Sequence, residues 1–198
     1  MTQTAIALFL FLLPLAYSPG PGNLFFAANG ARFGVRATLP ASLGYHVATW
    51  LVTAAIGFGA LRALDAAPTM FSVLKVAGAL YVLWIAVGLL RAGRHDTSEE
   101  AQPALFRDGA MLLLLNPKAY VIIALMFTQF LDVPGPDKTL LVLGITTLFT
   151  LNNLIAFTIW TIMGAQLGVL FARAGSARAM NIGFGLILGA VALWMLLA

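Results

Sequence analysis

Six long apolar segments constrain this chain more than any other feature of its sequence. They cover residues of about 4–28, 39–61, 69–90, 109–131, 139–163 and 178–198. Each is close to the length of about 20 residues with which a helix crosses the roughly 30 Å hydrocarbon layer of a bilayer. Since 61% of the 198 residues are hydrophobic and only 9% are charged, the apolar content exceeds what a soluble core requires. The sequence therefore predicts an all-α, polytopic membrane protein with six transmembrane helices, forming one transporter-sized domain over residues 1–198.

Lys and Arg in the connections predict the orientation of these segments. Most of them follow the first, third and fifth segments, whereas the opposite side holds only Arg62 and Lys138. The larger group consists of Arg32, Arg36, Arg91, Arg94, Arg107, Arg173 and Arg178. By the positive-inside rule, the connection at about 91–108 is then cytoplasmic, and both termini lie outside, on the periplasmic side.

A run of helix-breaking residues interrupts the first segment. It consists of Ser18, Pro19, Gly20, Pro21, Gly22 and Asn23. Proline removes a backbone donor and clashes with the preceding turn, and glycine leaves helical dihedrals at little cost. In hydrocarbon, freed backbone groups are tolerated only where they face protein or a water-filled cavity. The run therefore indicates either part of a substrate site or a tight connection between two short buried helices.

A second interruption lies inside the fourth segment, at Asn116, Pro117 and Lys118. At 1.5 Å per residue it is roughly 12–15 Å below the inner surface, so Lys118 is expected near the middle of the membrane. Ionisable residues at that depth are costly and usually functional. Lys118 is predicted to bind a substrate carboxylate, and the alternative is a lysine tied to carbonyls that the first break frees.

Five further side chains are candidates for the transport path. Lys75 and Tyr81 lie in the third segment, and Asn152 and Asn153 lie in the fifth, where they would face a cavity or bond between helices. Lys75 could instead extend to the membrane interface. His46 is the candidate for proton coupling because its unperturbed pKa, about 6.5, lies near neutrality, and the alternative is a histidine that is simply hydrogen-bonded.

The arrangement of the segments predicts two halves of three helices each, in opposite orientation, with helices 1 and 4 broken. No residue-by-residue match between the halves supports this 3+3 inverted repeat. Gly164 and Gly168 are four residues apart, which predicts close packing of their helix against another.

The composition argues against an enzyme and against bound cofactors or metals. Cysteine is absent, all seven Asp and Glu residues fall in connections or at segment ends, and His46 is the only histidine in a segment. Neither a nucleophile with its base nor a metal cage is then available in the membrane. The net charge of +4 comes from residues that flank apolar runs, so nucleic acid is not expected as a partner.

Three motifs together make the chain resemble the LysE/RhtB family of bacterial amino-acid exporters. The run from Ser18 to Asn23 is similar to the family's Pro-Gly-Pro signature, Leu74 to Tyr81 to its Leu-Lys-x-x-Gly-Ala-x-Tyr run, and Asn116 to Ala119 to its Asn-Pro-Lys-Ala. Two positions depart from the family pattern: Thr128 replaces a common proline, and Thr49 replaces an acidic residue that many members carry. The resemblance implies a secondary transporter that exports amino acids or close derivatives across the inner membrane, driven by the proton gradient.

The combined hypothesis is a central substrate site between helices 1 and 4. Lys118 would bind the substrate carboxylate, and carbonyls around Pro19 to Gly22 would receive its ammonium group. The alternatives are a passive channel for small polar solutes and a membrane scaffold that transports nothing. The sequence leaves open the amino acid, the coupling ion and whether the chain forms a homodimer.

Overall fold

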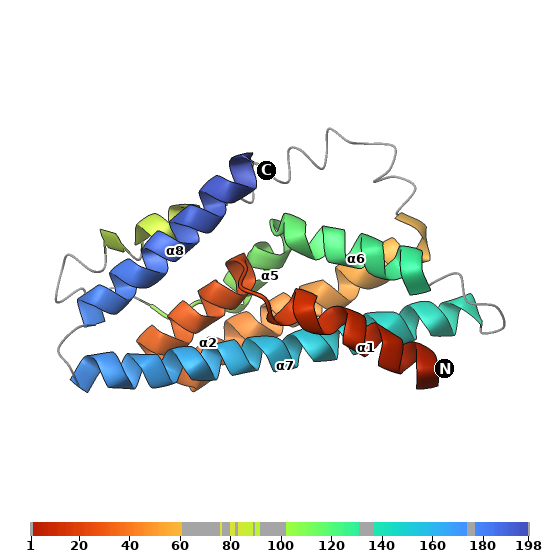
Figure 1. Cartoon of the computed structure of the whole chain (residues 1–198), viewed down its shortest axis with the longest axis horizontal. Coiled ribbons are helices and arrows are strands. Elements are labelled where there is room, and N and C mark those ends of the chain that lie inside the picture. The colour runs from red at the N-terminus through yellow and green to blue at the C-terminus, as the bar shows by residue number, and fades with distance from the viewer. Residues whose placement is uncertain are drawn as a thin grey trace.

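The computed structural model describes residues 2–60, 76, 80, 81, 83–88, 90, 91, 102–130, 137–173 and 177–197, and these residues form helices and their connections without any strand (Figure 1). The helices are α1 (Thr2–Tyr17), α2 (Pro21–Ala55), η1 (Ile56–Ala60), α5 (Phe106–Leu114), α6 (Pro117–Phe130), α7 (Lys138–Arg173) and α8 (Ala177–Leu197). The all-α prediction is confirmed. Lys75 and most of the predicted segment at 69–90 lie outside the described residues.

Helix α2 is a hairpin of two helices that join at Gly34. This glycine has φ +81° and ψ 171°, a conformation that essentially only glycine adopts. Along one continuous helix, residues 26 and 45 would be about 28 Å apart. The rings of Phe26 and Tyr45 nevertheless have centroids only 5.8 Å apart, so the chain reverses at Gly34. A single glycine thus replaces the longer connection expected between the segments at 4–28 and 39–61.

Helix α7 runs along the long axis of the molecule and supports the other helices (Figure 1). It extends ten residues beyond the predicted end at 163, to Arg173, although Gly164 and Gly168 are poor helix formers. Packing explains the difference, because both glycines lie directly against the α2 backbone. A Cβ at Gly164 would meet the carbonyl of Ala27, and one at Gly168 would meet the carbonyl of Ala31. The predicted close packing of these glycines is confirmed.

Among the described residues, the core consists of three apolar clusters. One joins α1, η1, α6 and α7 and includes Leu12, Ile123 and Phe149. The second lies between α2, α5 and α7 and is rich in aromatic rings. In the third, Leu188 of α8 packs with Ala86 and with Leu24 of α2. The aromatic cluster is the one that adjoins both helix breaks, because it contains Ala16 and Ala119.

Two described stretches are long and apolar enough to cross a bilayer by length and composition, Lys138–Leu170 and Pro21–Gly59, of which the second is folded back on itself at Gly34. Helices α5 and α6 would together make a third, although they bend by 62° at their junction. Helix α1 contributes a shorter apolar stretch, Thr4–Tyr17. The chain is thus a helical membrane protein, and its division into exactly six spans stays a prediction.

Candidate functional site

The first helix break is a well-bonded feature of the structure. Helix α1 ends at Tyr17, and α2 begins at Pro21. The carbonyls that α1 leaves free at its end are bound by side chains. Asn23 Nδ2 donates to the Ala16 carbonyl at 2.9 Å, and Trp160 Nε1 of α7 donates to the Tyr17 carbonyl at 3.2 Å. Because these groups have partners, the break persists inside an apolar environment.

The second helix break lies between α5 and α6. Helix α5 ends at Leu114, and Pro117 starts α6 after Leu115 and Asn116. The side chain of Asn116 is buried, and its Nδ2 donates to the Tyr45 hydroxyl at 3.5 Å. Asn116 Oδ1 has no hydrogen-bond partner among the described residues. A buried amide oxygen without a partner is a natural acceptor for a water or a ligand.

Lys118 joins the two breaks. Its Nζ donates to Ser18 Oγ at 2.9 Å and to the Ser18 carbonyl at 3.3 Å, although the two residues are 100 positions apart. The lysine side chain also lies against Gly20, where an added Cβ would be 3.1 Å from Nζ. The predicted meeting of the two breaks is therefore observed.

The charge of Lys118 has no anionic partner in the described part of the chain. An ammonium group has three N–H donors, and Ser18 accepts from two of them. A third donor and a whole positive charge remain at the junction of the two breaks. This arrangement can bind a carboxylate, because a hydrogen bond between two charged groups is stronger than one between neutral groups.

The other candidates from the sequence lie at different places. Tyr81 lines a pocket away from Lys118, described below, and Asn152 lines a groove of about 570 Å³ between α1 and α7. Neither polar atom of the Asn152 side chain has a partner in the described residues. Asn153 is also buried on α7. The structure therefore brings together the two breaks and Lys118, but not Tyr81 or Asn152 with them.

His46 lies on the second half of α2, buried beside the ring of Phe157 with centroids 5.6 Å apart. Its Nδ1 lies 2.7 Å from the Ser42 carbonyl. Because a carbonyl only accepts, Nδ1 carries the proton in this contact. The other ring nitrogen, Nε2, has no hydrogen-bond partner among the described residues.

The sequence analysis missed a pocket at the end of the molecule where α2 turns. It has a volume of about 450 Å³, and Arg32, Arg91 and Arg107 line it. In the sequence these arginines indicate only the orientation of the chain, because each belongs to a different predicted connection. Their predicted position on one side of the membrane was the only signal that they could meet.

These features define a class of protein: an all-helical membrane protein in which two interrupted helices meet at a lysine. The chain belongs to the LysE type translocator family, which matches residues 13–198. This membership confirms the family resemblance of the three sequence motifs.

Several relatives are similar over most of the chain. An uncharacterized membrane protein of Vibrio cholerae is 33% identical over 91% of this chain and 90% of its own length. The homoserine/homoserine lactone efflux protein of Salmonella typhi is 30% identical over 86% of this chain and 85% of its own. The leucine efflux protein of Klebsiella pneumoniae is 28% identical over 74% of this chain and 70% of its own. No solved structure matches this chain.

Proposed function

We propose that this chain exports amino acids or close derivatives across the bacterial inner membrane, and that the two helix breaks form its substrate site. The family and the relatives named as leucine and homoserine efflux proteins support the substrate class. The observation that carries the proposal is the bond from Lys118 to Ser18, which joins the breaks around an unpaired positive charge.

In the proposed binding step, Lys118 exchanges Ser18 for the substrate carboxylate. The carboxylate would also lie near the N-terminus of α6 at Pro117, where the helix dipole favours negative charge. The oxygens of Ser18 are released by this exchange and accept from the substrate ammonium group, together with the backbone around Pro19 to Gly22. One site thereby binds both charged groups of an amino acid. Alternate opening of the two bundle halves towards either side then moves the amino acid across the membrane.

Replacing Lys118 with Met tests the site. We expect Lys118→Met to lower export about 100-fold, towards the background of cells without the chain, since it removes a charge-assisted bond to the substrate. Excretion of amino acids from cells fed dipeptides measures the effect. Lys138→Met, at the start of α7, is the control and should export normally.

The same variants separate substrate binding from a structural role of Lys118. For Lys118→Met, the protein level in the membrane should match that of the wild type. Its melting temperature in detergent should stay within a few degrees, because Met retains the length and apolar stem of the side chain. Undiminished export by this variant would refute the proposed role. Loss of export together with loss of the folded protein would instead assign Lys118 to holding the breaks together.

Transport is proposed to be active, driven by the proton gradient, with His46 as the proton carrier. Export against a concentration gradient that stops when an uncoupler is added supports this mechanism. A flux that only follows the concentration gradient would favour the passive channel. The orientation with both termini periplasmic and assembly as a homodimer remain predictions.

A further inference from the structure

A second polar site lies at the end of the molecule where α2 reverses. It is the pocket of about 450 Å³ between α2, the described residues Tyr81, Trp84 and Arg91, and the segment before α5. Its volume falls in the range of about 300–1,000 Å³ that is common for small-molecule sites. Among the residues that the structure describes, three arginines line it, Arg32, Arg91 and Arg107, and Asp108 is the single carboxylate.

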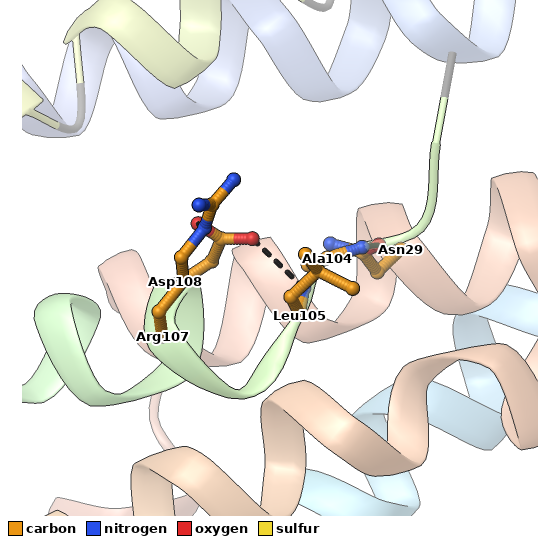
Figure 2. A network of polar contacts seen from close by, with 5 residues as sticks. All are labelled: Asn29, Ala104, Leu105, Arg107 and Asp108. Carbon is orange, nitrogen blue, oxygen red and sulfur yellow. Dashed lines mark hydrogen bonds and ion pairs between the residues drawn. The ribbon is translucent and has the colours of Figure 1, made fainter.

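The carboxylate of Asp108 already has partners within the protein. Asp108 Oδ2 accepts a hydrogen bond from the backbone N–H of Leu105 at 2.8 Å, which caps α5, and Oδ1 lies 3.8 Å from Arg107 Nε (Figure 2). Asn29 Oδ1 accepts from the N–H of Ala104 at 3.3 Å and so fixes the same segment against α2 (Figure 2). Within the described lining, Asp108 therefore compensates only part of the positive charge of the three arginines.

Arg32 is the arginine most suited to bind an anion. It is half-buried on α2, and its guanidinium lies 5.1 Å from the ring centre of Phe33. No carboxylate pairs with it among the residues that the structure describes. A partly desolvated guanidinium with free N–H groups binds a carboxylate in two parallel hydrogen bonds.

The rest of the lining suits an organic solute. Tyr81 and Trp84 stack with centroids 5.9 Å apart, and they line the pocket together with Phe25. Phe25 also belongs to the aromatic cluster of the core. The ring centroids of Phe25 and Phe26 are 5.4 Å apart, and those of Phe26 and Tyr45 are 5.8 Å apart. Tyr45 accepts from Asn116 of the second break. A continuous row of rings thus runs from this pocket to Asn116 of the second break.

We propose that this arginine pocket receives the solute at the inner mouth of the transporter, binding its carboxylate at Arg32 before the solute passes the aromatic rings to Lys118. The inference rests on the proposed export function and on the predicted cytoplasmic side of the three arginines. A lipid phosphate shares the chemistry of the carboxylate. The transported solute is favoured because aromatic rings line the pocket and connect it to the second break.

Fluorescence of Trp84 tests binding without requiring transport. The full chain in phosphatidylcholine nanodiscs is titrated with each common amino acid, and the signal from the pocket is the part lost in Trp84→Phe. The amino acid that changes the Trp84 fluorescence at the lowest concentration is then compared with its amide, which lacks the carboxylate. We expect Arg32→Gln to raise the dissociation constant of the amino acid about 10-fold or more and to leave that of the amide unchanged. Arg32→Lys should restore part of the affinity.

Arg36→Gln is the matched control, because Arg36 lies just beyond the turn of α2 and does not line the pocket. Equal effects of Arg32→Gln and Arg36→Gln would overturn the inference, and so would the absence of any titration that depends on Trp84. Loss of the titration in nanodiscs that contain phosphatidylglycerol would identify a lipid headgroup as the occupant and also overturn it.

Lys118→Met distinguishes failure of this inference from failure of the proposed function. We expect this variant to keep the Trp84 titration while its export is lost. Binding that depends on Arg32 in a chain that exports nothing would refute the proposed function alone. The arginine pocket alone would be refuted by a different result. In that result export depends on Lys118, but the export rate varies with the internal amino-acid concentration in the same way in the wild type and in Arg32→Gln.

Discussion

At the scale of single residues, the environment of Lys118 unites two interpretations that the sequence leaves open. Its ammonium is tied to Ser18 of the opposite break, as expected for a structural lysine. It also keeps a positive charge with no anionic partner among the described residues, as expected for a ligand-binding lysine. A half-buried cation loses part of its hydration, which carries a cost in free energy unless the cation is paired. The bonds to Ser18 offset part of this cost in the empty site, and a substrate carboxylate would offset more.

His46 has one ring nitrogen that can take up a proton without losing a bond. With Nδ1 donating to Ser42, the unpartnered Nε2 is the basic position. We expect His46→Gln to keep exchange of solute across the membrane but to lose export against a concentration gradient. Glutamine can still donate to the Ser42 carbonyl, but it cannot carry a proton. Proteoliposomes with an imposed pH gradient measure both activities.

Ser42→Ala is the control for His46. It removes the weak 3.4 Å contact of Ser42 Oγ with the ring and retains the backbone carbonyl. Uphill export should therefore survive in Ser42→Ala. If His46→Gln also exports uphill, His46 is not the proton carrier.

At the scale of helices, small residues determine how α2 and α7 pack. A bilayer supplies little hydrophobic driving force between helices, so close backbone packing must hold them together. Gly30 approaches the carbonyl of Thr161, and Gly164 and Gly168 approach the carbonyls of Ala27 and Ala31. The first half of α2, which begins at the first break, is thereby held on the end of α7 that also carries Trp160.

Gly164→Ala should loosen this packing. The added methyl would overlap the Ala27 carbonyl, so the two helices must separate, and overpacking of this kind costs about 1–3 kcal/mol. Gly144→Ala on the same helix is the matched control, because nothing lies within 4 Å of its Cβ position, and alanine there should be neutral or slightly stabilising. Thermal unfolding in detergent, followed by circular dichroism, compares the two. Equal melting temperatures would show that the close approach does not limit stability.

At the scale of the whole molecule, described residues from several helices meet at each of two ends. Arg32, Arg91 and Arg107 meet around one pocket near the turn of α2. At the other end, Gly57 of η1 packs against Phe127 of α6 and Val142 of α7. The long hairpin of α2 and the full length of α7 connect these ends. Three of the seven arginines from which the orientation is predicted thus lie together at one end of the molecule.

Single cysteines test the orientation, since the chain has no cysteine of its own. We expect a membrane-impermeant maleimide to label Thr139→Cys in intact spheroplasts, because the start of α7 is predicted on the periplasmic side and Thr139 is exposed. Arg107→Cys, whose native side chain is 80% exposed, should react only after the membrane is permeabilised. The reverse pattern would overturn the predicted orientation and place the arginine pocket on the periplasmic side.

The amino-acid sequence alone determined the membrane character of this chain, its helical class, the positions of both breaks and its family. These properties depend on local chemistry: apolar runs need hydrocarbon, and proline and glycine act on the backbone where they stand. It did not reveal that α2 turns at the single residue Gly34, nor that α7 continues to Arg173, because packing against neighbouring helices overrides local propensity.

Only the tertiary structure decided which distant side chains meet. The bond from Lys118 to Ser18 spans 100 positions, and the arginine pocket combines residues from three separate connections. Such contacts depend on how the helices pack and on the few ångströms that small residues allow between backbones. That information belongs to the assembled bundle, because no single helix contains both partners.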